Sequence, residues 1–422
     1  MSYLRRERGL FRRSKVTVSR GADYAIGRRV YKIKFKGSDM AKETIYVGVN
    51  DHEVDFFEGI YVVPNGVSYN SYIVQGDKIA VMDAVDERFA AEWLNNIKKA
   101  LGGKKPDYLV ILHMEPDHSG SILEFVKAYP QVTLVGNQKT FVMLGEYFGE
   151  LGADSATKKL TVKDGESLDL GGRVLNFVFA PLVHWPEVMV AYESAEKALY
   201  SADAFGKFGA LDCDEPWDDE ARRYYIGIVG KYGVQVTNAL KKLSAFDIKI
   251  IRPLHGPTLT DTIPHAIDLY TKWAGYIPEK EGVMIAYTSI YGHTKAAAEL
   301  LKAELDKRGV ENIIIDLVRH DKADSVALAF AYGKIVLATT TYNGEAFPVM
   351  REFVDHLAER NYRDRQIAII ENGTWSPFAA NAIIPRLEKC KNITYVGEPV
   401  KVFSALNAES RQKIAELADM LK

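Results

Sequence analysis

Cysteine is the scarcest residue in this chain of 422 residues, which contains Cys213 and Cys390 and no other. Two cysteines exclude a scaffold held by several disulfides, a CxxC redox motif and a metal cluster built from thiolates. No apolar run reaches the ~18–20 residues that a membrane-spanning helix needs, so we expect no membrane partner. Internal repeats and low-complexity segments are also lacking. At ~100–200 residues per domain, the length predicts two or three globular domains.

Net charge is low as well, formally −2, and this argues against nucleic acid as the main partner. The charge is unevenly spread, because residues 1–39 hold twelve Lys/Arg and three Asp/Glu. This basic N-terminal extension (1–39) has three interpretations: an organelle transit peptide, an arm that binds anionic surfaces, or an addition upstream of a natural start at Met40. It has no apolar segment typical of a secretory signal. We therefore expect a cytoplasmic protein, with organelle targeting as the alternative.

Two stretches with different patterns follow the extension. Residues 40–277 contain short strand-like runs with occasional helical stretches, such as Ala221–Leu240. The segment 275–282 holds two Gly, one Pro and three charges, a composition typical of a linker. From 282 to 422, five apolar strands alternate with helices, which predicts a doubly wound parallel sheet covered on both faces. These strands are Val283–Tyr287, Ile313–Leu317, Ile335–Ala338, Ile367–Ile370 and Ile393–Val396.

Histidines and carboxylates cluster directly after the predicted buried strand Tyr108–Leu112. Four potential metal ligands fall within six residues, namely His113, Glu115, Asp117 and His118. Pro116 lacks an N–H and restricts its predecessor, so we expect a loop here and not a helix. Three further candidates, His184, Asp203 and His255, each stand just beyond another predicted strand. Since ligand sites open at the carboxyl ends of strands, all seven side chains can meet at one rim.

A single histidine after a strand is more often an ordinary loop residue than a ligand, but seven ionisable groups change that balance. Gathered at strand ends, they would repel one another or stay unsatisfied without a cation. Seven exceed the ~four ligands that one Zn²⁺ takes, whereas two metals that share one carboxylate would use all of them. A mixture of imidazole and carboxylate without thiolate suits iron or manganese as well as zinc.

A second candidate site follows the strand Val283–Tyr287, where Thr288-Ser-Ile-Tyr-Gly-His-Thr294 leads into a helix. Hydroxyls and a glycine at a helix N-terminus make an anion site, although such a loop can also be a plain helix cap. Two further loops follow the third and fourth strands and supply aromatic residues suited to sandwich a planar ring. In a 2-1-3-4-5 sheet the three loops meet at the switch point. The candidate cofactor-binding residues are Ser289, Ile290, Tyr291, Gly292, His293, Thr294, Thr340, Thr341, Tyr342, Asn343, Gly344, Asn372, Gly373, Thr374 and Trp375.

The motif H-x-E-x-D-H, with its distant His, Asp and His, resembles the diiron site of the flavodiiron proteins, also called A-type flavoproteins. The loop with Ser289, Gly292 and Thr294 resembles the [ST]-x-x-G-x-T phosphate loop of flavodoxins. The resemblance spans residues 40–422 and implies an α/β chain with two domains. A metallo-β-lactamase-like αββα domain (40–277) would precede a flavodoxin-like doubly wound parallel sheet (282–422).

One position separates this motif from that of related zinc hydrolases, which carry H-x-H-x-D-H. Glu115 replaces the middle histidine here. A carboxylate is a harder, anionic ligand and stabilises ferric iron better than imidazole does. Two other functions remain open: a zinc-dependent hydrolase fused to a flavodoxin, and an electron carrier whose metals are structural.

The resemblance also implies roles for the seven ligands and for bound cofactors. His113, Glu115 and His184 would bind one iron, Asp117, His118 and His255 the other, and Asp203 would bridge the two iron ions. With FMN in the second domain, the chain would be an oxidoreductase that reduces O2 to water, NO to N2O, or both.

Partners follow from the same resemblance. Because two cysteines cannot form a rubredoxin domain, the electron donor is expected to be external, such as a rubredoxin. A head-to-tail homodimer, or a dimer of dimers, would bring the FMN of one subunit to the irons of the other. A tyrosine near the substrate pocket would be Tyr224 or Tyr225. The segment Phe57-Glu58-Gly59 departs from the His-Gly pattern of some relatives.

Overall fold

The computed structural model describes residues 44–152 and 155–422. The basic N-terminal extension and its three interpretations lie outside these residues. In the part of the chain that is described, every helix is too short or too polar to cross a bilayer.

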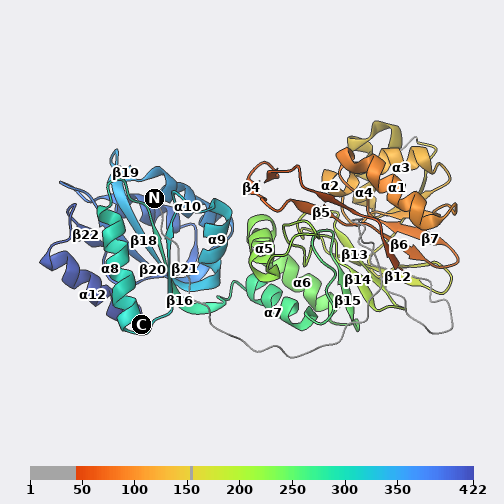
Figure 1. Cartoon of the computed structure of the whole chain (residues 1–422). Coiled ribbons are helices and arrows are strands. Elements are labelled where there is room, and N and C mark those ends of the chain that lie inside the picture. Colours follow the sequence, from red (N-terminus) through yellow and green to blue (C-terminus); the bar gives the residue numbers. More distant parts are fainter. Residues whose placement is uncertain (1–43, 153–154) are drawn as a thin grey trace, which may run out of the picture. The chain divides into compact units, whose positions relative to one another are not determined.

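Two sheets form the centre of the first half of the chain (Figure 1). The first runs β1-β6-β7-β8-β9-β10 and the second β11-β12-β13-β14-β15. The strands of the first sheet are β1 (Thr44–Tyr46), β6 (Tyr72–Gln75), β7 (Ile79–Met82), β8 (Tyr108–Val110), β9 (Thr133–Gly136) and β10 (Lys158–Thr161). Those of the second are β11 (Ser167–Asp169), β12 (Val174–Phe179), β13 (Met189–Glu193), β14 (Ala198–Tyr200) and β15 (Ile250–Arg252). Two small pairs join β2 (Val49–Asp51) to β5 (Val67–Tyr69) and β3 (Phe56–Phe57) to β4 (Tyr61–Val62).

Alternation of side chains along the first sheet explains why both of its faces are buried. Successive side chains of a strand point to opposite faces. Val74 packs with Phe177 of the second sheet, whereas its neighbour Ile73 belongs to the cluster that contains Trp93 and Phe125. The helical segments after β7, β8 and β9 are η1 (Glu87–Phe89), α1 (Ala90–Leu101), α2 (Pro116–Ser119), α3 (Ile122–Ala128), α4 (Gln138–Tyr147) and η2 (Gly149–Leu151).

The helical layer of the second sheet contains the stretch expected over 221–240, which is helical throughout. It consists of four successive segments of different helical geometry, and α7 (Ile263–Ala274) follows later. The four are α5 (Trp217–Tyr224), the π-helical η3 (Tyr225–Val229), η4 (Gly230–Tyr232) and α6 (Gly233–Leu243). Glycine is costly inside a helix, and Gly227 is needed because a Cβ there would lie 2.7 Å from the ring of Tyr61. The predicted αββα arrangement is confirmed.

The second half of the chain forms one parallel sheet in the order β17-β16-β18-β20-β21, which is the expected 2-1-3-4-5 order. Its strands are β16 (Lys280–Tyr287), β17 (Asn312–Asp316), β18 (Tyr332–Tyr342), β20 (Arg363–Asn372) and β21 (Lys391–Tyr395), with β19 (Glu345–Ala346) and β22 (Val400–Val402) at the sides. One face carries α8 (His293–Lys307) and α12 (Ala408–Met420), and the other carries α9 (Lys322–Ala331), α10 (Pro348–Glu359) and α11 (Ala379–Leu387). The flavodoxin-like sheet is therefore confirmed.

The expected linker at 275–282 is more ordered than its composition indicates. Strand β16 already begins at Lys280. Glu279 accepts hydrogen bonds from Arg222 and from the indole of Trp273, and Arg365 donates to the carbonyl of Tyr276. These bonds satisfy the polar groups of a segment that carries glycine, proline and charges.

Candidate functional site

Each of the seven predicted metal ligands lies just past the carboxyl end of a strand. The run 113–118 follows β8, and His184, Asp203 and His255 follow β12, β14 and β15. These last three strands point the same way, because β13 is antiparallel to both of its neighbours and β15 is parallel to β14. The loop expected at Pro116 is instead the start of α2. Proline is tolerated at the first position of a helix, where its missing N–H would have no partner in the helix.

The structure brings all seven side chains together in two adjoining groups. The first group is His113, Glu115, His184 and Asp203, and the second is Asp117, His118 and His255. Asp203 Oδ2 lies 3.2 Å from His184 Nε2, and Asp203 Oδ1 lies 3.2 Å from His118 Nε2. One carboxylate therefore faces both groups, as a bridging ligand must.

The nitrogen and oxygen atoms that could bind metal point at one another. They do not point at N–H or O–H groups of the surrounding protein. His118 Nε2 and His255 Nε2 are 3.0 Å apart, a separation that needs a proton or a cation between them. Both oxygens of Asp117 and Oδ1 of Asp203 are buried and have no well-oriented hydrogen bond from the described residues. Buried carboxylates are costly unless they are paired or bind metal. Oxygen and nitrogen donors in two groups fit a pair of cations.

The charges within the metal-free cluster are strongly coupled. Burial disfavours the charged form of Asp203, but the neighbouring His113 and His118 hold the pKa of its carboxyl well below the usual range. Burial also disfavours the imidazolium of His184, yet hydrogen bonds with Asp203 and Glu115 raise its pKa to about 9. In the absence of metal, protons on the histidines take the place of the cations.

Aromatic side chains cover one side of His255. The ring centroids of Phe57 and Tyr224 each lie 5.4 Å from the imidazole. Burial and the negative charge of Asp203 raise the pKa of the Tyr224 phenol well above its usual value, so it stays neutral. Tyr225 packs instead against Tyr270, with ring centroids 5.0 Å apart. The structure thus distinguishes two tyrosines that the sequence left open.

Glu58 stands at the exposed turn between β3 and β4, where the sequence departs from the His-Gly pattern. Although the residue is open to solvent, partial burial of its carboxyl and the negative charge of Glu115 raise its pKa to about 7. This chain therefore presents a carboxyl group at this edge of the cluster.

A second site opens at the carboxyl end of the parallel sheet, as a cleft of about 700 Å³. Every candidate cofactor-binding residue of the sequence lines it except Gly292. Gly292 is the N-cap of α8 with φ 92°, a left-handed conformation that favours glycine, and its N–H donates to Ser289 Oγ at 3.1 Å. Among the residues that the structure describes, no Lys, Arg, Asp or Glu lines the cleft.

Three residues of this cleft were missed from the sequence, namely Ser376, Phe378 and Ser404. Ser404 Oγ lies 2.7 Å from Thr374 Oγ1, and the Phe378 N–H donates to Thr341 Oγ1 at 2.8 Å. The sequence signal for Ser404 is the alternation Val400-Lys-Val402 before it, which is typical of a strand and forms β22 beside β20.

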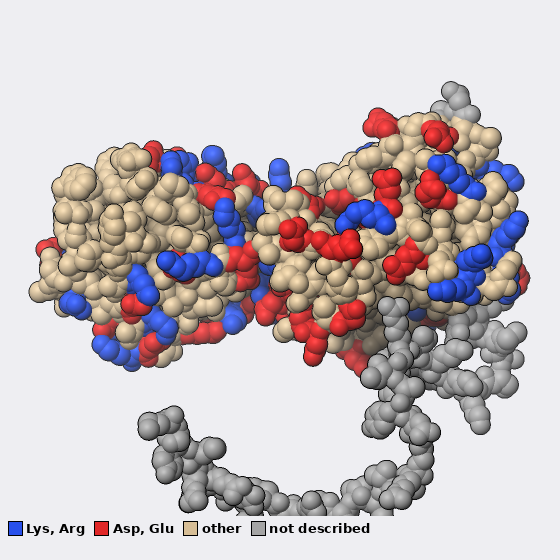
Figure 2. All heavy atoms as spheres, turned by 45° about the horizontal axis from the view of Figure 1, so that its top comes forward, with Lys and Arg blue, Asp and Glu red and all other residues tan. Residues whose placement is uncertain are grey.

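Aromatic rings stand in solvent at the mouth of the cleft. Tyr291 is 89% exposed and Trp375 is 90% exposed. Figure 2, in which the top of Figure 1 comes forward, shows a largely uncharged face on the half of the chain that carries β16–β22. The cleft is therefore neutral and aromatic, unlike the charged cluster of the first half.

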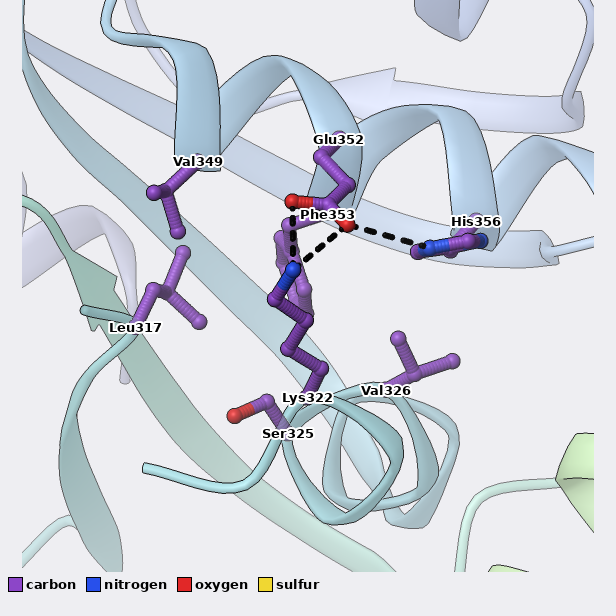
Figure 3. A pocket seen from close by; sticks show the side chains of 8 residues that line it. All are labelled: Leu317, Lys322, Ser325, Val326, Val349, Glu352, Phe353 and His356. Carbon is purple, nitrogen blue, oxygen red and sulfur yellow. Dashed lines mark hydrogen bonds and ion pairs between the residues drawn. The ribbon is translucent and has the colours of Figure 1, made fainter. Parts of the chain in front are cut away.

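A smaller cavity lies between α9 and α10 (Figure 3). The ion pair of Lys322 and Glu352 crosses it, with Nζ and Oε1 2.7 Å apart. Its volume of about 10 Å³ is enough for one water molecule at most. It cannot take an organic cofactor.

Comparison with known proteins agrees with these two sites. The model of the ODP family beta lactamase matches residues 67–256, a range that includes all seven ligands. An anaerobic nitric oxide reductase flavorubredoxin of Escherichia coli O1:K1 / APEC is 28% identical over 360 residues, covering 81% of this chain and 73% of the relative. Among solved structures, the flavodiiron protein of Giardia intestinalis has a TM-score of 0.80 at 26% identity, covering 92% of this chain and 98% of that one. Rubredoxin oxygen:oxidoreductase of Desulfovibrio gigas shares the fold, with a TM-score of 0.83 at 23% identity, covering 91% and 97%.

Fold and site together define a class of two-domain protein: a metallo-β-lactamase-like domain with a dinuclear ligand cluster, followed by a flavodoxin-like domain with a neutral aromatic cleft. Over most of its length, the chain is similar in sequence to a flavorubredoxin and in structure to a flavodiiron protein.

Metal binding to the metal-free protein should release protons at pH 7. With a pKa of about 9, His184 is protonated at this pH and must lose its proton to bind a cation through Nε2. Affinity for Zn²⁺ should therefore rise as the pH rises from 7 toward 9. Calorimetric titration in two buffers of different ionisation enthalpy measures the number of protons released. His265→Ala, which alters an exposed histidine outside the cluster, should give the wild-type number, and a release of zero would contradict the assignment.

Proposed function

We propose that this protein is an oxidoreductase that reduces O2 to water, NO to N2O, or both, at a non-haem diiron site. The observation that carries this proposal is the cluster of seven ligands in two groups, with Asp203 facing both. The substrates are those in the names of the similar proteins, a nitric oxide reductase and an oxygen oxidoreductase.

The ligand groups assign each side chain a role at the metals. His113, Glu115 and His184 would hold one iron, Asp117, His118 and His255 would hold the other, and Asp203 would be shared by the two positions. When bound, the two irons supply electrons to the gas and act as Lewis acids toward the oxygens that form. Glu115, a hard anionic ligand, favours iron over the zinc of related hydrolases. Tyr224 presents a neutral phenol as a hydrogen-bond donor, and Phe57 keeps that side of the pocket apolar.

The neutral cleft of the second half is the proposed FMN site. Ser289 and Thr294, with the backbone N–H groups at the start of α8, bind the phosphate through hydrogen bonds and the helix dipole. Tyr342 and Trp375 sandwich the flavin ring. FMN, when bound, supplies electron transfer between the donor and the irons.

The partners are proposed on the same basis. An external donor, rubredoxin or a similar one-electron carrier, supplies the electrons. The two cysteines are free thiols, which suits the reducing cytoplasm. A head-to-tail homodimer is supported by two exposed apolar surfaces on one chain: Phe56, Ile60 and Val62 at the metal domain, and Tyr291 and Trp375 at the cleft.

Asp203→Asn should abolish gas reduction while leaving the flavin reducible by its donor. Since loss of an outer partner of a metal ligand already costs ~10–100-fold in activity, loss of the shared ligand should cost more than ~100-fold. Consumption of O2 and NO and the flavin absorbance are measured together with metal content. Asp212→Asn, at an exposed aspartate outside the cluster, should behave as wild type. Native zinc with hydrolase activity would overturn the proposal, and unchanged activity in Asp203→Asn would favour an electron carrier.

Trp375→Ala should weaken FMN binding and leave the iron content near that of wild type. The side chain is exposed and lines only the cleft, so its loss removes stacking, worth ~0.5–1.5 kcal/mol beyond buried area, without unfolding the sheet. Flavin fluorescence during dialysis gives the change in affinity. Phe403→Ala removes a neighbouring exposed ring that does not line the cleft, and should retain FMN. Equal loss of FMN and iron in Trp375→Ala would argue against separate sites.

Mixing Asp203→Asn with Trp375→Ala protein that has been dialysed free of FMN tests the head-to-tail dimer. In a heterodimer, the flavin of an Asp203→Asn subunit would serve the intact irons of a Trp375→Ala subunit. After random exchange of subunits, half of the dimers are mixed, and each mixed dimer has one of its two flavin–iron pairs intact. About a quarter of wild-type activity should therefore return. Activity is measured after subunit exchange, with each variant alone as the control. If electrons pass within one chain, no activity returns.

A further inference from the structure

The histidines of the cluster differ at the ring nitrogen that points away from it. His113 Nδ1 lies 2.8 Å from Glu187 Oε1, whereas His255 Nδ1 donates to the backbone carbonyl of Ser68 at 2.8 Å. His118 Nδ1 is buried and has no hydrogen-bond partner among the described residues. A histidine that donates to a carboxylate is a stronger electron donor to its metal than one that donates to a neutral group.

Glu187 is fixed in position by hydrogen bonds. It is 1% exposed, and Oε1 also accepts the backbone N–H of Met114 at 2.8 Å. The side-chain amide of Asn137 donates a hydrogen bond to the backbone carbonyl of Glu187, so the backbone of Glu187 is also held in place. Oε1 thus faces two N–H groups, that of His113 Nδ1 and that of the Met114 backbone, and a carboxylate oxygen can accept from both. Its negative charge therefore acts on one histidine in one orientation.

This carboxylate makes the cluster asymmetric in charge. Each group has one carboxylate of its own, Glu115 or Asp117, and the two share Asp203. Glu187 adds a further negative charge behind the first group alone. The other buried carboxylate nearby, Asp83, accepts backbone N–H bonds from Leu112 and His113 and does not contact an imidazole.

We propose that Glu187 is a positioning residue that makes the metal position of His113, Glu115 and His184 the one that favours ferric iron. The inference rests on the proposed diiron function. When an external reductant gives one electron to the oxidised pair, Fe³⁺ becomes Fe²⁺ at the position of Asp117, His118 and His255, and no bond is made or broken. The first position then takes the second electron, at a lower reduction potential.

Glu187→Gln tests this, because it keeps an oxygen acceptor of the same reach and removes the charge. The lower of the two iron potentials should rise, and the higher one should change little. A tenfold loss of the preference for ferric iron corresponds to a rise of ~59 mV in the reduction potential of a one-electron couple. The gap between the two potentials should narrow, and a smaller gap lowers the maximum population of the mixed-valent state. In a reductive titration of the iron- and FMN-loaded protein, the mixed-valent EPR signal should therefore reach a lower maximum than in wild type. Iron affinity at the first position should fall by ~10–100-fold.

Two further variants separate charge from packing. Glu187→Asp keeps the charge, so its potentials should lie closer to wild type than those of Glu187→Gln. Glu193→Gln removes another fully buried carboxylate, one that pairs with Arg173, and should leave both potentials unchanged.

Several outcomes would overturn the inference. These are an equal shift of both potentials, no shift with both irons retained, the same potentials in Glu187→Asp and Glu187→Gln, or loss of both irons alike. If Glu187→Gln releases iron, loss of one of the two irons supports the assignment. If the wild-type protein binds zinc and never gives a mixed-valent signal, the proposed function itself is overturned. If the wild type gives the signal and Glu187→Gln has the same potentials, only the role of Glu187 is overturned.

Discussion

The rest of the first domain depends on the convergence of buried carboxylates and imidazoles around Asp203. Gathering these groups away from water is costly, and the cost is offset only by a cation pair or by protons. The fold meets this constraint with two facing sheets, since strand ends of both sheets supply ligands from rigid positions. The apolar cluster between the sheets, which includes Val74 and Phe177, holds the strands that fix the distances between the ligand loops.

The second site is built on an opposite principle. Its cleft has no charged side chain, so an anionic group there is held by hydroxyls, backbone N–H groups and the start of α8. Neutral walls would place little electric field on the proposed flavin, and Trp375 is exposed at the mouth of the cleft. The two halves therefore differ in chemistry: one gathers ionisable ligands in a buried cluster, and the other presents a neutral aromatic cleft.

The sequence predicted the two folds and the residues of both sites because those signals are local. A ligand after a strand needs only the strand pattern, and regular alternation of strands and helices predicts a doubly wound parallel sheet. Where tertiary contacts decide, the sequence was insufficient. The stretch expected to be helical over 221–240 is helical, but its π-helical segment is not foreseeable, and within it Gly227 lies against Tyr61, a residue far away in the chain. Tyr224 and Tyr225 could not be separated by sequence because adjacent residues of one helical segment differ only in what packs against each.

Glu187 shows the same limit at the site itself. It follows Pro186 in a loop, a context in which glutamate is usually exposed, and only the fold buries it against His113. The loop that carries it also carries His184, so one segment supplies a ligand of the first group and the carboxylate that orients another. Any change that moves this loop alters both the geometry and the charge of the same metal position. The asymmetry of the cluster is thus tied to the path of one loop between β12 and β13, whereas the seven ligands alone would be nearly balanced in charge.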